Sequence, residues 1–265
     1  MLHCHARKDY NFSVAHKNVI YRLTPAGREA WESQDSALPA EYRRILWLMD
    51  FHGHAGAMED FLRQHPQSMV DDWLAEIHEL GLIEPVPEGE GPPKGRDPDM
   101  TMTDPADVRR ASESATESLS RAGSYLAMER IAKREPTRKA AGEIVVLIVE
   151  DDPDQLALAD LRVSMAGYQV RAASSVRGFL ETMLDSGAPD LLMLDVALPD
   201  GDGFEVLAKL RRHHVFGDLP IVMLTARNDA ADIGRGLVLG ADGYITKPYT
   251  KKIVADVIRR VLRQA

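Results

Sequence analysis

The C-terminal half of the chain alternates between two hydrophobic periods. Five short apolar or β-branched runs predict strands, at residues 144–149, 168–172, 190–194, 220–224 and 243–246. Five amphipathic stretches of helical length follow them, at residues 153–166, 175–187, 202–213, 228–239 and 250–263. Strands that alternate with helices predict a parallel sheet covered on both faces. The expected fold class of this half is therefore α/β, with a (βα)₅ arrangement.

The N-terminal part of the chain carries shorter elements. We predict a strand running into a helix over residues 19–30, helices at 39–52, 56–64 and 68–80, and a strand at 82–86. Apolar residues mark one face of two of these helices: Ile45, Leu46, Leu48 and Met49 on the helix at 39–52, and Val70, Trp73, Leu74, Ile77 and Leu80 on the helix at 68–80. With Trp31 and Trp47, they form the predicted core of a small, mainly helical domain.

Two groups of breaker residues divide the chain. Residues 85–100 read PVPEGEGPPKGRDPDM, a stretch without the apolar periodicity that a packed core needs, and a second group lies between Glu135 and Gly142. We therefore predict an N-terminal domain at 1–85, a linker and connector helix at 86–142, and a C-terminal domain at 143–265.

The connector helix is predicted between Asp104 and Glu135. A four-three-four spacing relates its small and apolar residues Ala115, Leu119, Ala122 and Leu126. Such a seam fits either a short two-stranded coiled coil, and hence a dimer, or a helix docked on one of the chain's own domains.

Composition restricts the function classes. Of the 265 residues 45% are hydrophobic, but no apolar run approaches the roughly 20 residues of a membrane span. The N-terminus lacks the apolar segment of a secretion signal, and the single cysteine, Cys4, excludes an internal disulfide. We therefore expect a cytoplasmic protein without membrane association. The net charge of −9 disfavours nucleic acid as a partner.

Polar residues follow the predicted strands of the C-terminal domain directly. They are Glu150, Asp151 and Asp152 after the first strand, Asp195 after the third, Thr225 after the fourth and Lys247 after the fifth. Open parallel sheets bind ligands at the carboxyl ends of their strands, so we expect these side chains to share one pocket. Asp152 is the exception, because it precedes Pro153 and is interpreted as a helix cap.

This set of side chains indicates phosphoryl chemistry. Clustered carboxylates repel one another unless a cation joins them, and their hard oxygen atoms suit Mg²⁺. A lysine ammonium and a threonine hydroxyl beside them suit a transferring phosphoryl group, because they neutralise its oxygens and donate hydrogen bonds to them. Asp195 is then the expected nucleophile, forming an aspartyl-phosphate.

The segments VLIVEDDPD, LLMLDVALPDGDGFEVL, IVMLTA and GADGYITKPY, in this order and spacing, resemble the receiver domain of two-component response regulators. The resemblance covers about residues 143–265 and implies a flavodoxin-like fold. It also implies that Asp195 accepts phosphate from a sensor histidine kinase or a histidine phosphotransfer protein. Mg²⁺ would be held by Glu150, Asp151, Asp195 and the backbone carbonyl of Ala197.

The same resemblance assigns the residues that read the phosphoryl group. Lys247 pairs with it, and Thr225 and Tyr244 match the family's switch pair, in which the hydroxyl moves to the phosphate and the aromatic ring swings inward. Gly243 and Val238 stand where many receivers joined to DNA-binding domains carry the acids of a charged dimer face. Dimerisation through the fourth helix, fifth strand and fifth helix is therefore left open.

The N-terminal domain resembles a winged helix-turn-helix, with three short helices ending in HELGLIEP. That fold is widely used to bind DNA, but a recognition helix needs Lys or Arg to contact phosphates. Residues 67–84 contain no Lys or Arg and five acids, Asp71, Asp72, Glu76, Glu79 and Glu84. Carboxylates facing phosphates oppose binding, so a protein-interaction module is the favoured interpretation.

The sequence thus predicts a response regulator of a phosphorelay, whose phosphorylation on Asp195 switches contacts between the N-terminal domain and a downstream protein. The alternative is a phosphorylation-dependent transcriptional regulator that binds DNA through the winged helix. No enzyme activity is expected beyond the receiver's own Mg²⁺-dependent phosphoryl transfer and dephosphorylation.

Overall fold

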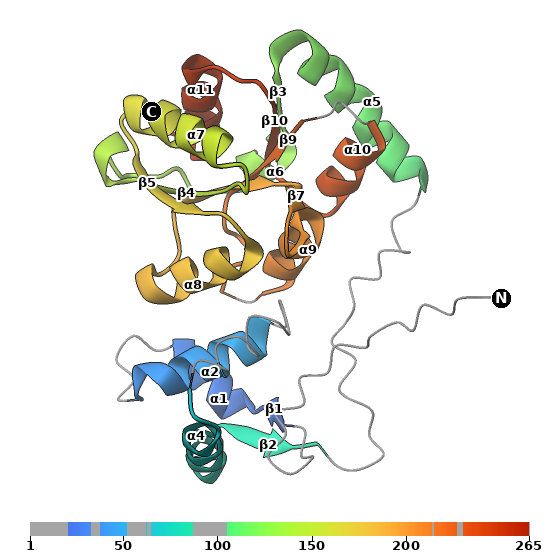
Figure 1. Ribbon diagram of the computed structural model, residues 1–265. Helices are drawn as coiled ribbons and strands as arrows, with labels where there is room; N and C mark the ends of the chain where they lie inside the picture. The colour runs from blue at the N-terminus through green and yellow to red at the C-terminus, as the bar shows by residue number, and fades with distance from the viewer. Residues whose placement is uncertain are drawn as a thin grey trace, which may run out of the picture. The chain divides into compact units, whose positions relative to one another are not determined.

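A computed structural model describes residues 21–32, 38–51, 62, 65–86, 105–213, 215–226 and 230–264. The chain divides into two compact units, Met1–Asp97 and Pro98–Ala265, each with its own hydrophobic core (Figure 1). Among the helices that can be described, none is both long and apolar enough to cross a membrane.

Within its described residues, the N-terminal unit joins three helices to a two-stranded sheet. Its elements are β1 (Tyr21–Leu23), α1 (Pro25–Glu32), α2 (Ala40–Phe51), α4 (Gln67–Glu79) and β2 (Ile83–Pro85). β1 and β2 pair antiparallel, with Arg22 opposite Glu84. The helix predicted at 56–64 lies outside the described residues except at Leu62, which is helical.

Most of the predicted apolar faces pack into this unit's core. Ile45, Leu46, Leu74 and Ile77 are fully buried, and Trp47 is nearly so. Leu80, predicted as a core residue, is 57% exposed, so that expectation was wrong. Leu80 is the C-cap residue of α4, and Gly81 turns the chain directly after it with a φ of +70°, so Leu80 lies at the exposed end of the helix.

The C-terminal unit contains the predicted strands and helices within a few residues. They are β4 (Val145–Val149), α7 (Pro153–Met165), β5 (Gln169–Ala173), α8 (Val176–Ser186), β6 (Leu191–Asp195), α9 (Gly203–Arg212), β9 (Ile221–Thr225), α10 (Ala230–Val238), β10 (Gly243–Thr246) and α11 (Lys251–Val261). A short hairpin of β7 (Ala197–Leu198) and β8 (Gly201–Asp202) follows β6, and a 3₁₀ turn, η1 (Ala141–Glu143), precedes β4.

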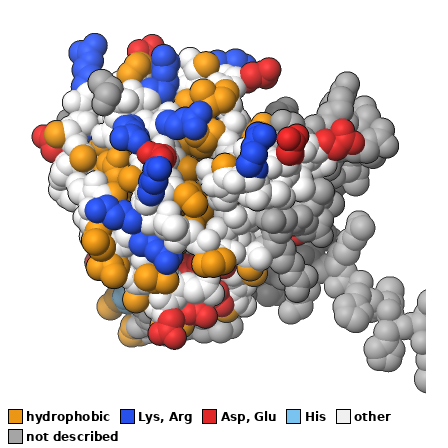
Figure 2. Space-filling model, turned by 90° about the horizontal axis from the view of Figure 1, so that it is seen from above, with side chains coloured by type: hydrophobic (Ala, Val, Ile, Leu, Met, Phe, Trp, Pro, Cys, Tyr) orange, Lys and Arg blue, Asp and Glu red, His pale blue; other side chains and the backbone are white. Residues whose placement is uncertain are grey.

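The strands build a parallel sheet in the order β10-β9-β6-β4-β5, which is a flavodoxin-like arrangement. Helices α7 and α11 cover one face, and α8 and α9 lie on the other (Figure 1). The central strands β4 and β6 are apolar over nearly their whole length because both of their faces are covered. On the surface seen in Figure 2, hydrophobic side chains lie among Lys and Arg.

The connector adds three further elements to this unit: α5 (Pro105–Ala122), β3 (Ser124–Leu126) and α6 (Met128–Ala132). β3 pairs antiparallel with β10 and becomes the sixth strand of the sheet. The connector helix is therefore shorter than predicted, because Gly123 adopts a φ of +69° and ends it, and Leu126 lies in a strand.

The structure also distinguishes the two alternatives for the connector helix, a two-stranded coiled coil and a helix docked on one of the chain's own domains. Ala115 and Leu119 are buried, and α5 packs against α10 of its own unit. The structure thus has the docked helix. The compact unit starts at Pro98, and the domain boundaries placed at 86 and 143 stay sequence-based predictions.

Replacing Ile148 by Ala tests the packing of the central strand. Ile148 is fully buried in β4, so the substitution removes apolar contacts and leaves a cavity, at a cost of about 2–5 kcal/mol in the free energy of unfolding. Leu158→Ala on α7, where the side chain is 42% exposed, is the matched control and is expected to change it by less than about 0.5 kcal/mol. Urea unfolding of both variants makes the comparison, and equal losses would contradict the buried position of β4.

Candidate metal and phosphoryl site

The register of the sheet brings the predicted site residues to one edge. Asp195 is the last residue of β6 and pairs with Leu224 of β9, while Thr225, the last residue of β9, pairs with Thr246 of β10. Glu150 and Asp151 follow β4, whose last residue pairs with Leu194. Each strand therefore ends at the same level, and the residues that follow it converge.

The acids and the lysine lie in direct contact. Ligand oxygens of Glu150, Asp151 and Asp195 all lie within 4.8 Å of one another. Lys247 Nζ lies 2.5 Å from Glu150 Oε2 and 3.2 Å from Asp195 Oδ2. Glu150 and Asp195 are buried and Asp151 is exposed, so the cluster reaches solvent on the side of Asp151.

Burial sets the protonation behaviour of the two inner acids. It raises the pKa of Asp195 and of Glu150, and Lys247 offsets part of this rise by pairing with both carboxylates. Three carboxylates face one ammonium, so the cluster carries excess negative charge. An all-oxygen donor set with uncompensated charge fits a divalent hard cation such as Mg²⁺.

The remaining predicted residues lie on strands next to those that carry this cluster. Ala197 lies in β7, next to Val196, whose N–H donates to Asp195 Oδ1 at 2.9 Å. Thr225 is buried, and its carbonyl accepts a hydrogen bond from Lys247 N at 2.8 Å. Tyr244 lies on β10 with only 1% of its surface exposed, and its hydroxyl points at the Asp232 carbonyl of α10, 3.5 Å away. Their roles in the switch stay predictions.

Three other acids near the site cap helices. Asp152 Oδ1 accepts from the N–H groups of Asp154 and Gln155 at the start of α7, as its position before Pro153 predicts. Asp202 caps α9 in the same way. The carboxylate of Asp200 accepts from Val176 N and Arg177 N at the start of α8, a contact across the fold that local sequence does not show.

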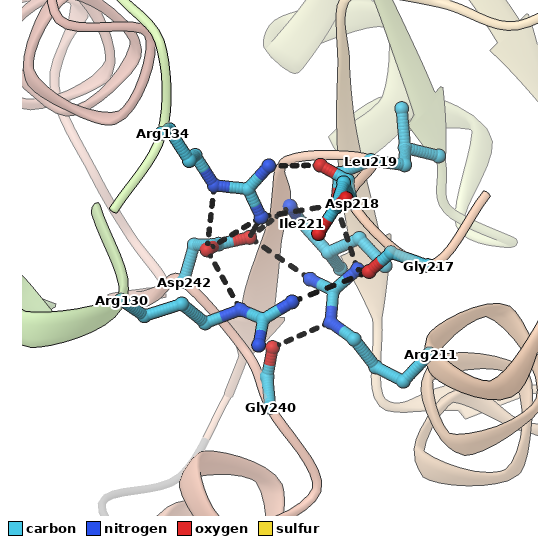
Figure 3. A network of polar contacts seen from close by, with 9 residues as sticks. All are labelled: Arg130, Arg134, Arg211, Gly217, Asp218, Leu219, Ile221, Gly240 and Asp242. Carbon is cyan, nitrogen blue, oxygen red and sulfur yellow. Dashed lines mark hydrogen bonds and ion pairs between the residues drawn. The ribbon is translucent and has the colours of Figure 1, made fainter. Parts of the chain in front are cut away.

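The sequence interpretation missed one polar centre altogether. Asp242, directly before β10, is fully buried and is contacted by Arg130, Arg134 and Arg211 (Figure 3). In the sequence, Asp242 stands out only as part of the segment GADGY of the receiver motif. Burial lowers the pKa of Arg211 to about 9, so this arginine keeps its charge at neutral pH. Asp242 lies between Ala241 and the apolar strand β10, which indicates that its carboxylate is buried. The arginines that contact it are remote in the chain, so the sequence does not show them.

Comparison with known proteins agrees with this geometry. Residues 146–259 match the family model of the response regulator receiver domain. The chain is 40% identical over 120 residues to the transcriptional regulatory protein GltR of Pseudomonas aeruginosa, which covers 45% of this chain and 49% of that protein. It is 36% identical over 119 residues to the phosphate regulon transcriptional regulatory protein PhoB of Escherichia coli, covering 45% and 52%.

Residues 146–259 are therefore a response regulator receiver domain. The chain spans about half the length of the relatives that it matches. Among solved structures, a putative response regulator from Chloroflexus aurantiacus is 33% identical, with a TM-score of 0.44, and covers 46% of this chain and 98% of its own.

Asp195→Asn is expected to raise the melting temperature in metal-free buffer at neutral pH. Since burial raises the pKa of Asp195, the folded state binds its proton more tightly than the unfolded state, and the free energy of unfolding falls as the pH rises through the folded-state pKa. The neutral amide removes this cost, and each 1 kcal/mol gained corresponds to about 2–4 °C in a chain of this size.

Calorimetry at acid and neutral pH measures the effect, and the gain is expected to shrink toward acid pH. Asp185→Asn, on the exposed end of α8, is the control and is expected to leave the melting temperature unchanged at either pH. A lower melting temperature for Asp195→Asn at neutral pH would show that the buried carboxylate is stabilising.

Proposed function

We propose that this protein is a cytoplasmic response regulator whose Asp195 accepts a phosphoryl group from a histidine kinase or phosphotransfer protein. The observation that supports this most directly is the contact set of Asp195, which shares its pocket with Glu150, Asp151 and Lys247. The receiver domain itself implies a phosphodonor partner. Chemistry beyond the gain and hydrolysis of this phosphoryl group is not part of the proposal.

The residues of the site have separable tasks. Glu150, Asp151, Asp195 and the Ala197 carbonyl would hold Mg²⁺, which when bound neutralises charge on the phosphoryl oxygens. An Asp195 carboxylate oxygen attacks phosphorus, the P–N bond to the donor imidazole breaks, and the imidazole nitrogen leaves with the bonding electrons. Lys247 Nζ, 3.2 Å from Asp195 Oδ2, is placed to pair with the oxygens of the transferred group, and the Thr225 hydroxyl donates to one of them.

Incubation with acetyl phosphate and Mg²⁺ tests the acceptor. Intact-protein mass spectrometry is expected to show one added phosphoryl group in the wild type and none in Asp195→Asn. Lys247→Ala removes the ammonium that neutralises the transferred charge and is expected to slow phosphorylation about 100-fold. Lys251→Ala, an exposed lysine four residues later, serves as the matched control and should react at the wild-type rate. Labelling that persists in Asp195→Asn would move the acceptor elsewhere.

The output is proposed to be a protein contact made by the N-terminal unit. On α4 the side chains of Asp72, Glu76 and Glu79 are exposed, while Val70, Leu74 and Ile77 face the core. An acidic helix surface suits a basic protein partner and repels a phosphate backbone. The winged-helix fold of this unit belongs to the same proposal. It is supported by the three helices among the described residues and by the antiparallel pair of β1, before α1, with β2, after α4.

DNA binding is the second candidate, because relatives matched through the receiver are named transcriptional regulators. Those matches cover 45% of this chain, and PhoB and GltR extend well beyond the matched part. Fold and family of the receiver do not decide what the other domain contacts.

A duplex-DNA titration of the full-length protein separates the two candidates. It is run at two salt concentrations, with and without beryllofluoride and Mg²⁺, and with Asp195→Ala as control. We expect no binding in any state, because acidic side chains on α4 repel phosphates. Binding that weakens steeply with salt, appears with beryllofluoride and is lost in Asp195→Ala would instead establish the transcriptional role.

A further inference from the structure

The connector closes the edge of the receiver sheet. β3 pairs with β10 so that Tyr125 lies opposite Tyr244, the residue assigned to the switch. The pairing is extended at both ends, where Thr246 N donates to the Gly123 carbonyl at 3.1 Å and Ala127 N donates to the Asp242 carbonyl at 2.8 Å. Without β3, the backbone of β10 would be an unpaired edge on this side.

The connector helix covers the neighbouring helix as well. α5 packs against α10 and buries Ser112, Ala115 and Leu119 (Figure 1). β3 and α5 together therefore occupy the surface formed by β10 and α10. We call residues 105–134, from the start of α5 to Arg134, the docked segment.

A buried ion cluster fixes the end of the docked segment (Figure 3). Asp242 accepts hydrogen bonds from Arg130 Nε at 3.0 Å and from the Arg134 guanidinium at 2.8 Å, both contributed by the docked segment. Arg211 and the backbone N–H of Ile221 complete the shell at 2.9 and 2.7 Å. Other N–H groups of the three arginines donate hydrogen bonds to the backbone carbonyl groups of Gly217, Asp218, Leu219 and Gly240. Buried charges of this kind are costly to separate.

Gly243 is the residue that allows the strand to dock. A Cβ at this position would lie 2.7 Å from the Tyr125 carbonyl oxygen and 2.9 Å from Leu126 Cδ2. The nearest atom is backbone, so a side chain cannot be accommodated without moving β3. Gly243 stands where many receivers carry an acid of the dimer face, and its lack of a side chain leaves room for β3.

Tyr244 connects this surface to the phosphoryl site. Its hydroxyl occupies the space beneath α10 where a side chain at Gly236 would lie, beside Phe204. The Tyr244 ring therefore lies beneath α10, which α5 covers, and on β10, which pairs with β3. β10 then leads within three residues to Lys247, which contacts Asp195.

We propose that the docked segment is an internal ligand of the α10–β10 surface, and that phosphorylation of Asp195 tightens its docking. The inference rests on the proposed function, in which the phosphoryl group favours the inward position of Tyr244. Docking of β3 and α5 favours the same buried ring, so the two events stabilise one state. Linkage then requires that the docked segment strengthens phosphoryl binding by the same factor.

Hydrogen exchange of the full-length protein, followed by mass spectrometry, measures docking at residues 124–127. Beryllofluoride with Mg²⁺ serves as the phosphoryl mimic, and its binding is recorded independently by fluorine NMR. We expect exchange at these amides to slow by about 5–100-fold in the wild type, within the usual range of coupling between sites, and to be unaffected in Asp195→Ala.

Gly243→Asp restores an acid at the position and is expected to undock β3. Exchange at 124–127 should then be fast in both states, and beryllofluoride affinity should fall by the factor measured in the wild type. Gly142→Asp, where a Cβ would meet nothing within 4 Å, is the matched control. Should Gly243→Asp fail to fold, the double variant Arg130→Ala with Arg134→Ala replaces it. In this variant Asp242 still accepts hydrogen bonds from Arg211 and from Ile221 N. Arg121→Ala, on the exposed surface of α5, is the control for the double variant.

The outcomes separate the inference from the proposed function. Bound beryllofluoride with unchanged or faster exchange at 124–127 would overturn the inference and leave phosphorylation of Asp195 intact. Wild-type exchange in both Gly243→Asp and the arginine double variant would also overturn it. Failure of the wild type to bind beryllofluoride would overturn the proposed function itself.

Discussion

The carboxylate of Asp242 holds the receiver unit together at its sheet edge. It is fully buried, and it binds an N–H of β9, an arginine of α9 and two arginines that follow β3. A buried charge without partners is strongly destabilising, so the packing of these elements depends on the groups that contact Asp242. β10 begins at the next residue and ends just before Lys247. The position of the site lysine thus depends on a strand that is anchored at its other end.

The α/β fold of the C-terminal unit and the acid cluster are predictable because their signals are local. Strand and helix periods, and polar residues directly after apolar runs, are read within about ten residues of sequence. Glu150, Asp151, Asp195 and Lys247 then come together by the geometry of any parallel sheet. The winding of the sheet and the switch residues came from the family resemblance and not from the pattern alone.

The rest depends on contacts between distant residues. Arg130 and Arg134 lie 112 and 108 positions from Asp242, and no local pattern relates them. β3 has three residues, too few to show a period, and its strand conformation depends on pairing with β10. Leu80 has a different explanation: it follows the apolar spacing of α4 but caps the end of the helix, where its side chain is exposed, and periodicity alone does not show this.

Gly243 and the strand it accommodates also determine what an excised receiver would be. A fragment starting at Val146, where the family match begins, would keep Asp242 but lose β3 and both connector arginines. The backbone groups of β10 would then be free to add a strand from another molecule. Self-association of such a fragment would result from the exposed edge of β10, and it would say nothing about the oligomeric state of the intact protein.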